Sequence, residues 1–235
     1  MSLLDWIRRR GRRLSGEQAL RLAKWRDLPE ADAKSLHAHQ RFVVVDVESS
    51  GLNVFHDHLI AIGAVAVEGG RISLGDSFYR VLRQARASSH ANILVHGIGG
   101  TEQTGGDDPA WVLLDFLDFI GKSPLTGFHA DFDDIMIRKA MRRHLGEPFR
   151  CKWLDLAYLA PALGRLSQGG PTGLDDWLQK FGIDNYRRHD ALADALATAQ
   201  LFQVLAYKAA QSGELRTADL VRVADSQEWL SRSLR

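Results

Sequence analysis

The amino-acid sequence predicts an α/β protein with a mixed β-sheet. One observation is a series of three strand-like segments, with the turn sequence Glu68-Gly69-Gly70 between the second and the third. The other is the alternation of helical and strand-like patterns that follows them. Three hairpin-type strands followed by alternating helices and strands are typical of an α/β fold in which the sheet is mixed.

The first expected strand covers residues 41–47. Phe42 to Val45 is an apolar, largely β-branched run that ends in polar residues and Gly51. This segment is too apolar for an edge position, so a buried strand is predicted. The second strand is expected at 59–67 and the third at about 77–82.

The segment ILVHGIGGTEQTGGDDP, residues 93–109, is expected to be a long loop because its glycines and Pro109 disfavour regular structure. Apolar residues then recur at helical spacing in 110–120. The later pattern predicts, in order, a short strand at 124–128, a helix at 133–145, a strand or loop to about 154 that leads into 155–163, a linker-like loop at 167–173, and helices at 174–181 and 191–210.

The composition is that of a soluble globular protein. The chain has 235 residues, of which 45% are hydrophobic and 25% charged, and its formal net charge is +1. A surface that binds nucleic acid would therefore have to be local. The single cysteine, Cys151, excludes an internal disulfide and fits a reducing cytoplasm. No membrane span and no signal peptide are recognised, so a cytoplasmic protein without a membrane partner is expected.

Two acidic residues stand at the end of the first strand. Side chains two apart on a strand point to the same face, so Asp46 and Glu48 project together. Two carboxylates this close repel each other unless a cation lies between them, and the simplest candidate is Mg²⁺ or Mn²⁺. Asp133 and Asp194 could complete a four-carboxylate cage of the kind that holds two metals for phosphoryl transfer.

Asp133 has a competing interpretation. Aspartate is a preferred helix N-cap, and Asp131, Asp133 and Asp134 all stand where the next helix is expected to begin. A carboxylate at the start of a helix that follows a strand can also face the strand ends of an open sheet.

His189 and Asp194 are five residues apart, which is about 140° around a helix, so both cannot face one metal from within the same helix. The pattern is satisfied if His189 lies in the preceding loop, Asp190 is the N-cap and Asp194 lies one turn inside. A histidine at that position is suited to take a proton from an attacking water.

Three segments, DVESSGL, FHADFD and HDALAD, occur in this order and resemble the DEDDh family of 3′–5′ exonucleases, to which the epsilon proofreading subunit of bacterial DNA polymerase III belongs. The usual family patterns are D-x-E-T-T-G-L, H-N-x-x-F-D and H-x-x-x-x-D. The resemblance covers roughly Arg41 to Lys208, with Phe128 and His129 standing where the family has His and Asn. It implies a ribonuclease H-like fold, a mixed five-stranded sheet flanked by helices.

The resemblance also implies the roles of individual residues. Asp46, Glu48, Asp133 and Asp194 would hold two divalent cations, Mg²⁺ or Mn²⁺, and His189 would be the general base in a hydrolysis that releases nucleoside 5′-monophosphates. The residues that would contact the 3′ end of single-stranded DNA or RNA are Ser49, Ser50, Gly51, Leu52, His96 and His129.

A second register remains open. Tyr186 and Asp190 fit Y-x-x-x-D, the third pattern of the related DEDDy exonucleases, in which tyrosine replaces the histidine. The pair His189 and Asp194 is preferred because the alanine-rich sequence after His189 resembles the DEDDh helix and would pack small side chains against the sheet.

The chain is expected to divide into a basic, helical N-terminal extension (1–40), a DEDDh exonuclease domain (41–210) and a short C-terminal helical tail (211–235). The first of these carries nine Lys/Arg against five Asp/Glu, and its run WIRRRGRRL could bind nucleic acid or form a solvated or docking helix. A free-standing exonuclease is favoured. The alternatives are a partner-dependent subunit that docks on a polymerase or another protein through its extensions, and a silent nucleic-acid-binding module, which the intact five-residue set disfavours.

Overall fold

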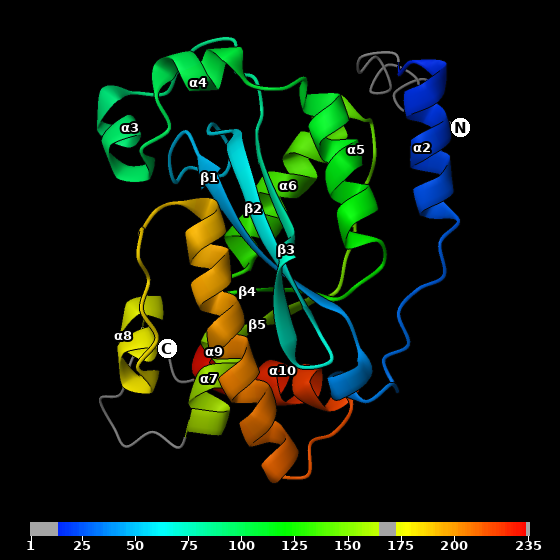
Figure 1. Ribbon diagram of the computed structural model, residues 1–235, viewed down its shortest axis with the longest axis vertical. Helices are drawn as coiled ribbons and strands as arrows, with labels where there is room; N and C mark the ends of the chain where they lie inside the picture. Colours follow the sequence, from blue (N-terminus) through cyan, green and yellow to red (C-terminus); the bar gives the residue numbers. More distant parts are fainter. Residues whose placement is uncertain (1–13, 165–172, 234–235) are drawn as a thin grey trace.

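A computed structural model describes residues 14–164 and 173–233 of the chain. Its centre is a mixed five-stranded sheet in the order β3-β2-β1-β4-β5 (Figure 1), which confirms the predicted fold class. β1 pairs antiparallel with β2 and parallel with β4. The strands are β1 (Phe42–Ser49), β2 (Leu59–Glu68), β3 (Arg71–Val81), β4 (Leu125–Gly127) and β5 (Trp153–Asp155).

The central strand β1 has two buried faces, as its apolar sequence predicted. Val43, Val45 and Val47 belong to one hydrophobic core, whereas Phe42 and Val44 belong to another on the opposite face of the sheet. Because side chains alternate along a strand, Asp46 and Glu48 in the second half of β1 continue the face of Phe42 and Val44.

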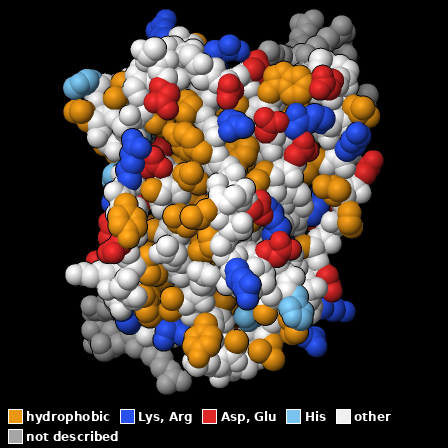
Figure 2. All heavy atoms as spheres, viewed as in Figure 1, with side chains coloured by type: hydrophobic (Ala, Val, Ile, Leu, Met, Phe, Trp, Pro, Cys, Tyr) orange, Lys and Arg blue, Asp and Glu red, His pale blue; other side chains and the backbone are white. Residues whose placement is uncertain are grey.

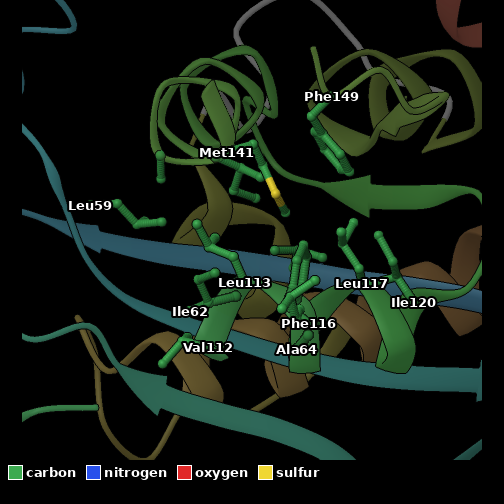
Figure 3. Close-up of a cluster of buried hydrophobic side chains, with 14 of the residues drawn as sticks. Leu59, Ile62, Ala64, Val112, Leu113, Phe116, Leu117, Ile120, Met141 and Phe149 are labelled. Carbon is green, nitrogen blue, oxygen red and sulfur yellow. The ribbon is translucent and has the colours of Figure 1, made fainter. Parts of the chain in front are cut away.

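Helices cover both faces of the sheet. α5 (Pro109–Ile120) and α6 (Asp131–His144) pack on one face, and Figure 3 shows Leu113 and Phe116 of α5 against β2. α9 (Ala191–Gln211) covers the other face and crosses in front of the strands in Figure 1, while α6 lies behind them. α7 (Leu156–Gly164) and α8 (Leu174–Phe181) pack beside α9.

The expectation of one long loop over 93–109 is wrong, because two short helices form around that segment. α3 (His90–His96) begins at Ser89, whose side chain accepts a hydrogen bond from the Asn92 amide, and ends at Gly97 in the left-handed conformation, with φ 72°. α4 (Gly100–Gly105) follows. The glycines therefore end and begin helices, and Pro109 occupies the first turn of α5, where its missing N–H costs nothing. The third strand is also longer than predicted, since it begins at Arg71.

Both terminal extensions pack on the core where the structure describes them. α2 (Gly16–Arg26) lies against α5, and Trp25 donates to the Gly121 carbonyl at 2.7 Å. α10 (Thr217–Ser233) packs on α7, and the short 3₁₀ turn His37–His39 is tied to the C-terminal segment through the His37 amide. The basic run of 1–13 and most of the loop expected at 167–173 lie outside the described residues.

The surface in view is of mixed charge. Figure 2 shows Lys/Arg and Asp/Glu side chains interspersed on this face, in keeping with a formal net charge of +1. Among the helices that the structure describes, none is both long enough and apolar enough to span a bilayer.

Candidate active site

The site is built where β1 meets the first turn of α9. On β1, Asp46 lies opposite Gly63 of β2, and the register of the pair shifts just after Glu48. A β-carbon at Gly63 would lie 2.2 Å from the main-chain carbon of Ala191, so only glycine allows α9 to approach β2 this closely. Ala191 and Ala195 are fully buried there, which confirms that small alanine side chains pack against the sheet.

This packing gathers three of the four predicted acids. Asp46, Glu48 and Asp194 each present a carboxylate oxygen within 4.8 Å of the others. Glu48 and Asp194 are buried, with 9% and 4% of their surface exposed, so the acids form a protein-enclosed cluster rather than a solvated face. All the ligand atoms are carboxylate oxygens, the kind preferred by hard divalent cations, so the cluster could hold a metal ion.

Asp133 reaches the same region from the other face. It is the third residue of α6, which begins after Ala130, and no side chain caps the helix, so the N-cap interpretation is wrong for all three aspartates. Asp133 is 6% exposed and does not belong to the three-acid group, but its charge acts on Asp46.

His189 lies in the loop before α9, as the spacing predicted. Asp190 is the N-cap and accepts from the Ala193 amide at 3.1 Å. His189 has φ 59°, and its amide donates to Asp194 at 3.0 Å. Tyr186 is 91% exposed and does not line the cavity described next, so the geometry favours the His189/Asp194 register.

An open cavity of about 280 Å³ lies over the acids. It brings His189 and His129 together with the three clustered carboxylates. The lining residues are Asp46, Val47, Glu48, Phe128, His129, Leu174, Arg188, His189 and Asp194.

The acids perturb one another strongly. The pKa of Asp46 is raised well above its ordinary value, first by burial and then by the charges of Asp133, Asp194 and Glu48. Burial, followed by the charge of Asp194, raises the pKa of Glu48 to about 8. Burial also raises the pKa of Asp133, although hydrogen bonds with main-chain groups oppose it. Because ionising these buried acids together costs free energy, a bound cation would stabilise the ionised cluster strongly.

Arg188 is a member of this site that the sequence patterns did not single out. Its guanidinium lies 2.7 Å from Asp194 and 2.8 Å from Asp175 of α8, and its charge lowers the pKa of both Asp46 and Glu48. Asn185 also donates to Asp194. The only signal in the sequence was the proximity of these residues to His189.

Asp155 is a second residue that sequence reasoning missed. It ends β5 and accepts hydrogen bonds from the amides of His129 and Ala130, both at 3.0 Å, and from that of Ala157 at 2.8 Å. These bonds hold the turn before α6, in which His129 has φ 58°, and so set the direction in which Asp133 enters the site.

The residues matched to the family's T-T-G-L sequence are Ser49, the last residue of β1, and the start of the loop between β1 and β2. The Ser49 hydroxyl donates to the Gly51 carbonyl at 2.7 Å, and the Ser50 hydroxyl donates to Asp57 at 2.8 Å. Both hydroxyls therefore brace the loop. Leu52 is 87% exposed, so its side chain is free to meet a ligand.

The two other predicted substrate contacts lie in different surroundings. His129 is exposed and lines the cavity. His96 is 3% exposed: its Nδ1 accepts from the Ile98 amide at 2.9 Å, and its Nε2 lies 2.9 Å from Asn92 Oδ1. The structure thus places His96 inside the α3–α4 turn and not in the cavity, and a contact with substrate stays a prediction.

Comparison with known sequences agrees with this geometry. A family model named RNase T and described as an exonuclease matches residues 43–202. The PolC-type DNA polymerase III of Thermotoga maritima is 28% identical over 188 residues, which cover 80% of this chain but only 13% of that relative. DNA polymerase III subunit epsilon of Aquifex aeolicus is 30% identical over 165 residues, covering 68% of this chain and 78% of the subunit.

Solved structures share the fold at low sequence identity. E. coli Exonuclease I in complex with a dT13 oligonucleotide superposes with a TM-score of 0.65 at 18% identity, covering 75% of this chain and 43% of that one. Exonuclease X in complex with 5′ overhanging duplex DNA gives 0.59 at 18% identity, covering 78% and 99%.

Proposed function

Since this chain belongs to the RNase T family of exonucleases, we propose that it is a metal-dependent 3′–5′ exonuclease that removes nucleoside 5′-monophosphates from single-stranded DNA or RNA. One observation carries this proposal: the oxygens of Asp46, Glu48 and Asp194 lie within 4.8 Å of one another, and His189 opens onto the same cavity. We assign residues 41–210 to the exonuclease domain.

The residues present fit divalent cations. Asp46, Glu48 and Asp194 would hold them, with Asp133 as the fourth acid of a two-cation site; burial and the neighbouring carboxylates raise the pKa values of Asp46 and Glu48, and a cation would favour their ionised forms. Mg²⁺ or Mn²⁺ suits an all-carboxylate donor set. When bound, such ions supply charge stabilisation to the phosphodiester oxygens.

His189 is the proposed general base. Its backbone is fixed by the hydrogen bond that its amide N–H donates to the Asp194 carboxylate, while its imidazole is exposed at the cavity, where it can take a proton from the attacking water. The exposed Leu52 would contact the terminal base, and the braced loop Ser49–Gly51 would present main-chain groups to the terminal sugar and phosphate.

The substrate class is supported by the structural neighbours, which were solved with a dT13 oligonucleotide and with 5′ overhanging duplex DNA. Choice between DNA and RNA depends on contacts to the 2′-hydroxyl. A second candidate role, a proofreading-type subunit of a polymerase or repair complex, is favoured by the similarity to the A. aeolicus epsilon subunit; α2 and α10 would then be available for docking.

The test uses DNA and RNA single strands of the same sequence, labelled at either end and incubated with Mg²⁺, Mn²⁺ or EDTA. We expect metal-dependent shortening from the 3′ end, and the loss of several orders of magnitude in turnover in His189→Ala and Asp46→Asn. Tyr186→Phe is the matched control, because it alters the rival register and should retain activity. Loss of activity in Tyr186→Phe together with normal activity in His189→Ala would refute the assignment.

If clean, folded protein shortens no strand on its own but does so when a polymerase is added and co-purifies with it, the subunit role replaces the free-standing one.

A further inference from the structure

A strongly basic groove lies along α6, beside the site but outside it. It encloses about 760 Å³ between α6, the end of the β1–β2 loop and the segment that follows β3. We call this the α6 groove. Its cationic lining residues are Arg83, Arg86, Arg138, Lys139, Arg142 and Arg143, against a single acid, Asp57. In a chain of net charge +1, this is a marked local excess of positive charge.

Among the described residues, four of these six cations have no carboxylate partner, and one of the four, Lys139, is bound to main-chain carbonyls instead. Arg83 pairs with Asp108 at 3.4 Å and Arg138 with Asp134 at 3.0 Å. Within the part of the chain that the structure describes, no carboxylate lies within 4.0 Å of the remaining three guanidinium groups, and all of these residues are exposed: Arg86, Arg142 and Arg143.

The acid that lines the groove forms no ion pair with these guanidinium groups. The Asp57 carboxylate is used inside the β1–β2 loop, where it accepts from the Ser50 hydroxyl and the Asn53 amide, both at 2.8 Å. Consistent with a positive field, the pKa of His58 is lowered, chiefly by burial and next by the charge of Arg143.

The α6 groove is physically joined to the candidate active site. Lys139 donates to the carbonyls of Val54 and Asp57 and so fastens the β1–β2 loop to α6. The same loop carries Leu52, and it also presents Phe55, a groove residue whose side chain is 85% exposed. α6 starts at the site with Asp133 and leads away to Arg143, about 15 Å along its axis.

We propose that the α6 groove binds the backbone of the substrate strand on the 5′ side of its terminal nucleotides, with Phe55 as a stacking surface at the entrance. The inference rests on the proposed nuclease function. Three unpartnered guanidiniums are suited to phosphate oxygens, and an exposed aromatic ring between basic side chains is a pattern of single-strand binding that tolerates any sequence. The groove would thus select long strands over short ones.

The test compares a DNA tetranucleotide, a twenty-nucleotide single strand and the duplex of that strand with its complement, by fluorescence anisotropy in EDTA. KM and kcat are measured on the two single strands with Mg²⁺. The variant is the double substitution Arg142→Gln/Arg143→Gln. Its control, Arg71→Gln/Arg150→Gln, removes the same charge from exposed arginines elsewhere on the surface. We expect the groove variant to weaken binding of the long strand at least about tenfold at low salt, and to reduce the slope of log K against log salt by about 1.4. Binding of the tetranucleotide and kcat should not change.

Equal long-strand affinity in the groove and control variants would overturn the groove while leaving the nuclease function intact. Weakened binding of a duplex with unchanged binding of the single strand would assign the groove to a complementary strand and overturn the proposal as stated. A wild-type protein that binds long strands through the groove yet hydrolyses none would instead refute the proposed function.

Discussion

Arg188 lies 2.7 Å from the carboxylate of Asp194, which forms the acidic cluster together with Asp46 and Glu48. Its other contact, with Asp175 at 2.8 Å, connects α8 to the same cluster. A side-chain cation therefore already neutralises part of the charge that a divalent ion would neutralise. Arg188 and a bound metal must compete for Asp194, although Arg188 also favours ionisation of Asp46 and Glu48.

Arg188→Gln should tighten metal binding at pH 9, where the acids are most ionised. Removing one positive charge from the neighbourhood of a divalent ion is worth on the order of 1 kcal/mol, about fivefold in Kd. The metal-free protein should lose stability by about 1 kcal/mol, because Asp194 loses a charged donor. Isothermal titration with Mn²⁺ and thermal melts in EDTA would measure both effects.

Arg187→Gln is the matched control, since Arg187 pairs with Asp190 at 3.4 Å and does not line the cavity. Weaker metal binding in Arg188→Gln than in this control would show that Arg188 orients Asp194 for the metal rather than competing with it.

The raised pKa of Glu48 predicts how the stability of the metal-free protein depends on pH. Its pKa is about 8 in the folded protein against 4.5 ordinarily, so the folded state holds the proton more tightly than the unfolded chain does. Stability attributable to this group is therefore present below pH 4.5 and is lost as the pH rises to about 8. A bound metal needs the ionised carboxylate, so the apparent affinity for Mg²⁺ should rise with pH over the same window.

Thermal melts between pH 5 and 9, in EDTA and in saturating Mg²⁺, test this prediction. In EDTA the wild type should lose more stability with rising pH than Glu48→Gln, which cannot ionise. Mg²⁺ should abolish the loss in the wild type. Parallel curves for the two proteins in EDTA would contradict the assignment of the titration to Glu48.

The position of each acid on its own strand or helix could be predicted from the sequence, because it depends only on the two-residue repeat of a strand and on where a helix begins. A repeat of two places Asp46 and Glu48 on one face of β1, and a helix start after Asp190 places Asp194 one turn inside α9. The order of elements was likewise sufficient for a mixed sheet, since three hairpin-type strands are followed by alternating helices and strands. The apolar run Phe42–Val45 predicted a buried strand, and all four residues are buried.

What could not be predicted depends on contacts between distant segments. Nothing near Gly63 shows that the main chain of Ala191 will rest on it, and nothing near Asp155 shows that it will hold the turn at His129. In residues 93–109 the glycines predict a loop, whereas in the fold they lie at the ends of two short helices. These helices become evident only once Gln103 is buried against Ile98.

His96 should make the α3–α4 segment sensitive to acid. Its Nδ1 accepts from the Ile98 amide, which requires a neutral ring, and burial lowers its pKa below the ordinary 6.5. A histidine with a lowered pKa contributes stability that is complete above pH 6.5 and is lost as the pH falls further, by up to about 1.4 kcal/mol per pH unit. Hydrogen exchange of the Ile98 amide from pH 7 to 5 would follow this loss.

His96→Asn supplies the control, because an asparagine oxygen can replace the acceptor Nδ1 without titrating in this range. Protection of the Ile98 amide should then vary less with pH than in the wild type. An equal loss of protection in both proteins would assign the acid sensitivity to another group.

Gly63 of β2 should not tolerate replacement by a residue with a side chain. A β-carbon there meets the main chain of Ala191 and Leu192 at 2.2–2.4 Å, so Gly63→Ala has to push the first turn of α9 away from the sheet. Overpacking of this kind costs about 1–3 kcal/mol. Because Asp194 lies in that turn, Mn²⁺ affinity should fall together with the free energy of unfolding.

Gly16→Ala is the control, since a β-carbon at Gly16 meets nothing within 4 Å. The double variant Gly63→Ala/Ala191→Gly separates two causes: a clash with the Ala191 side chain would be relieved, whereas a clash with its main chain would not, and we expect no recovery. Full recovery in the double variant, or unchanged metal affinity in Gly63→Ala, would show that close contact between β2 and α9 does not set the position of Asp194.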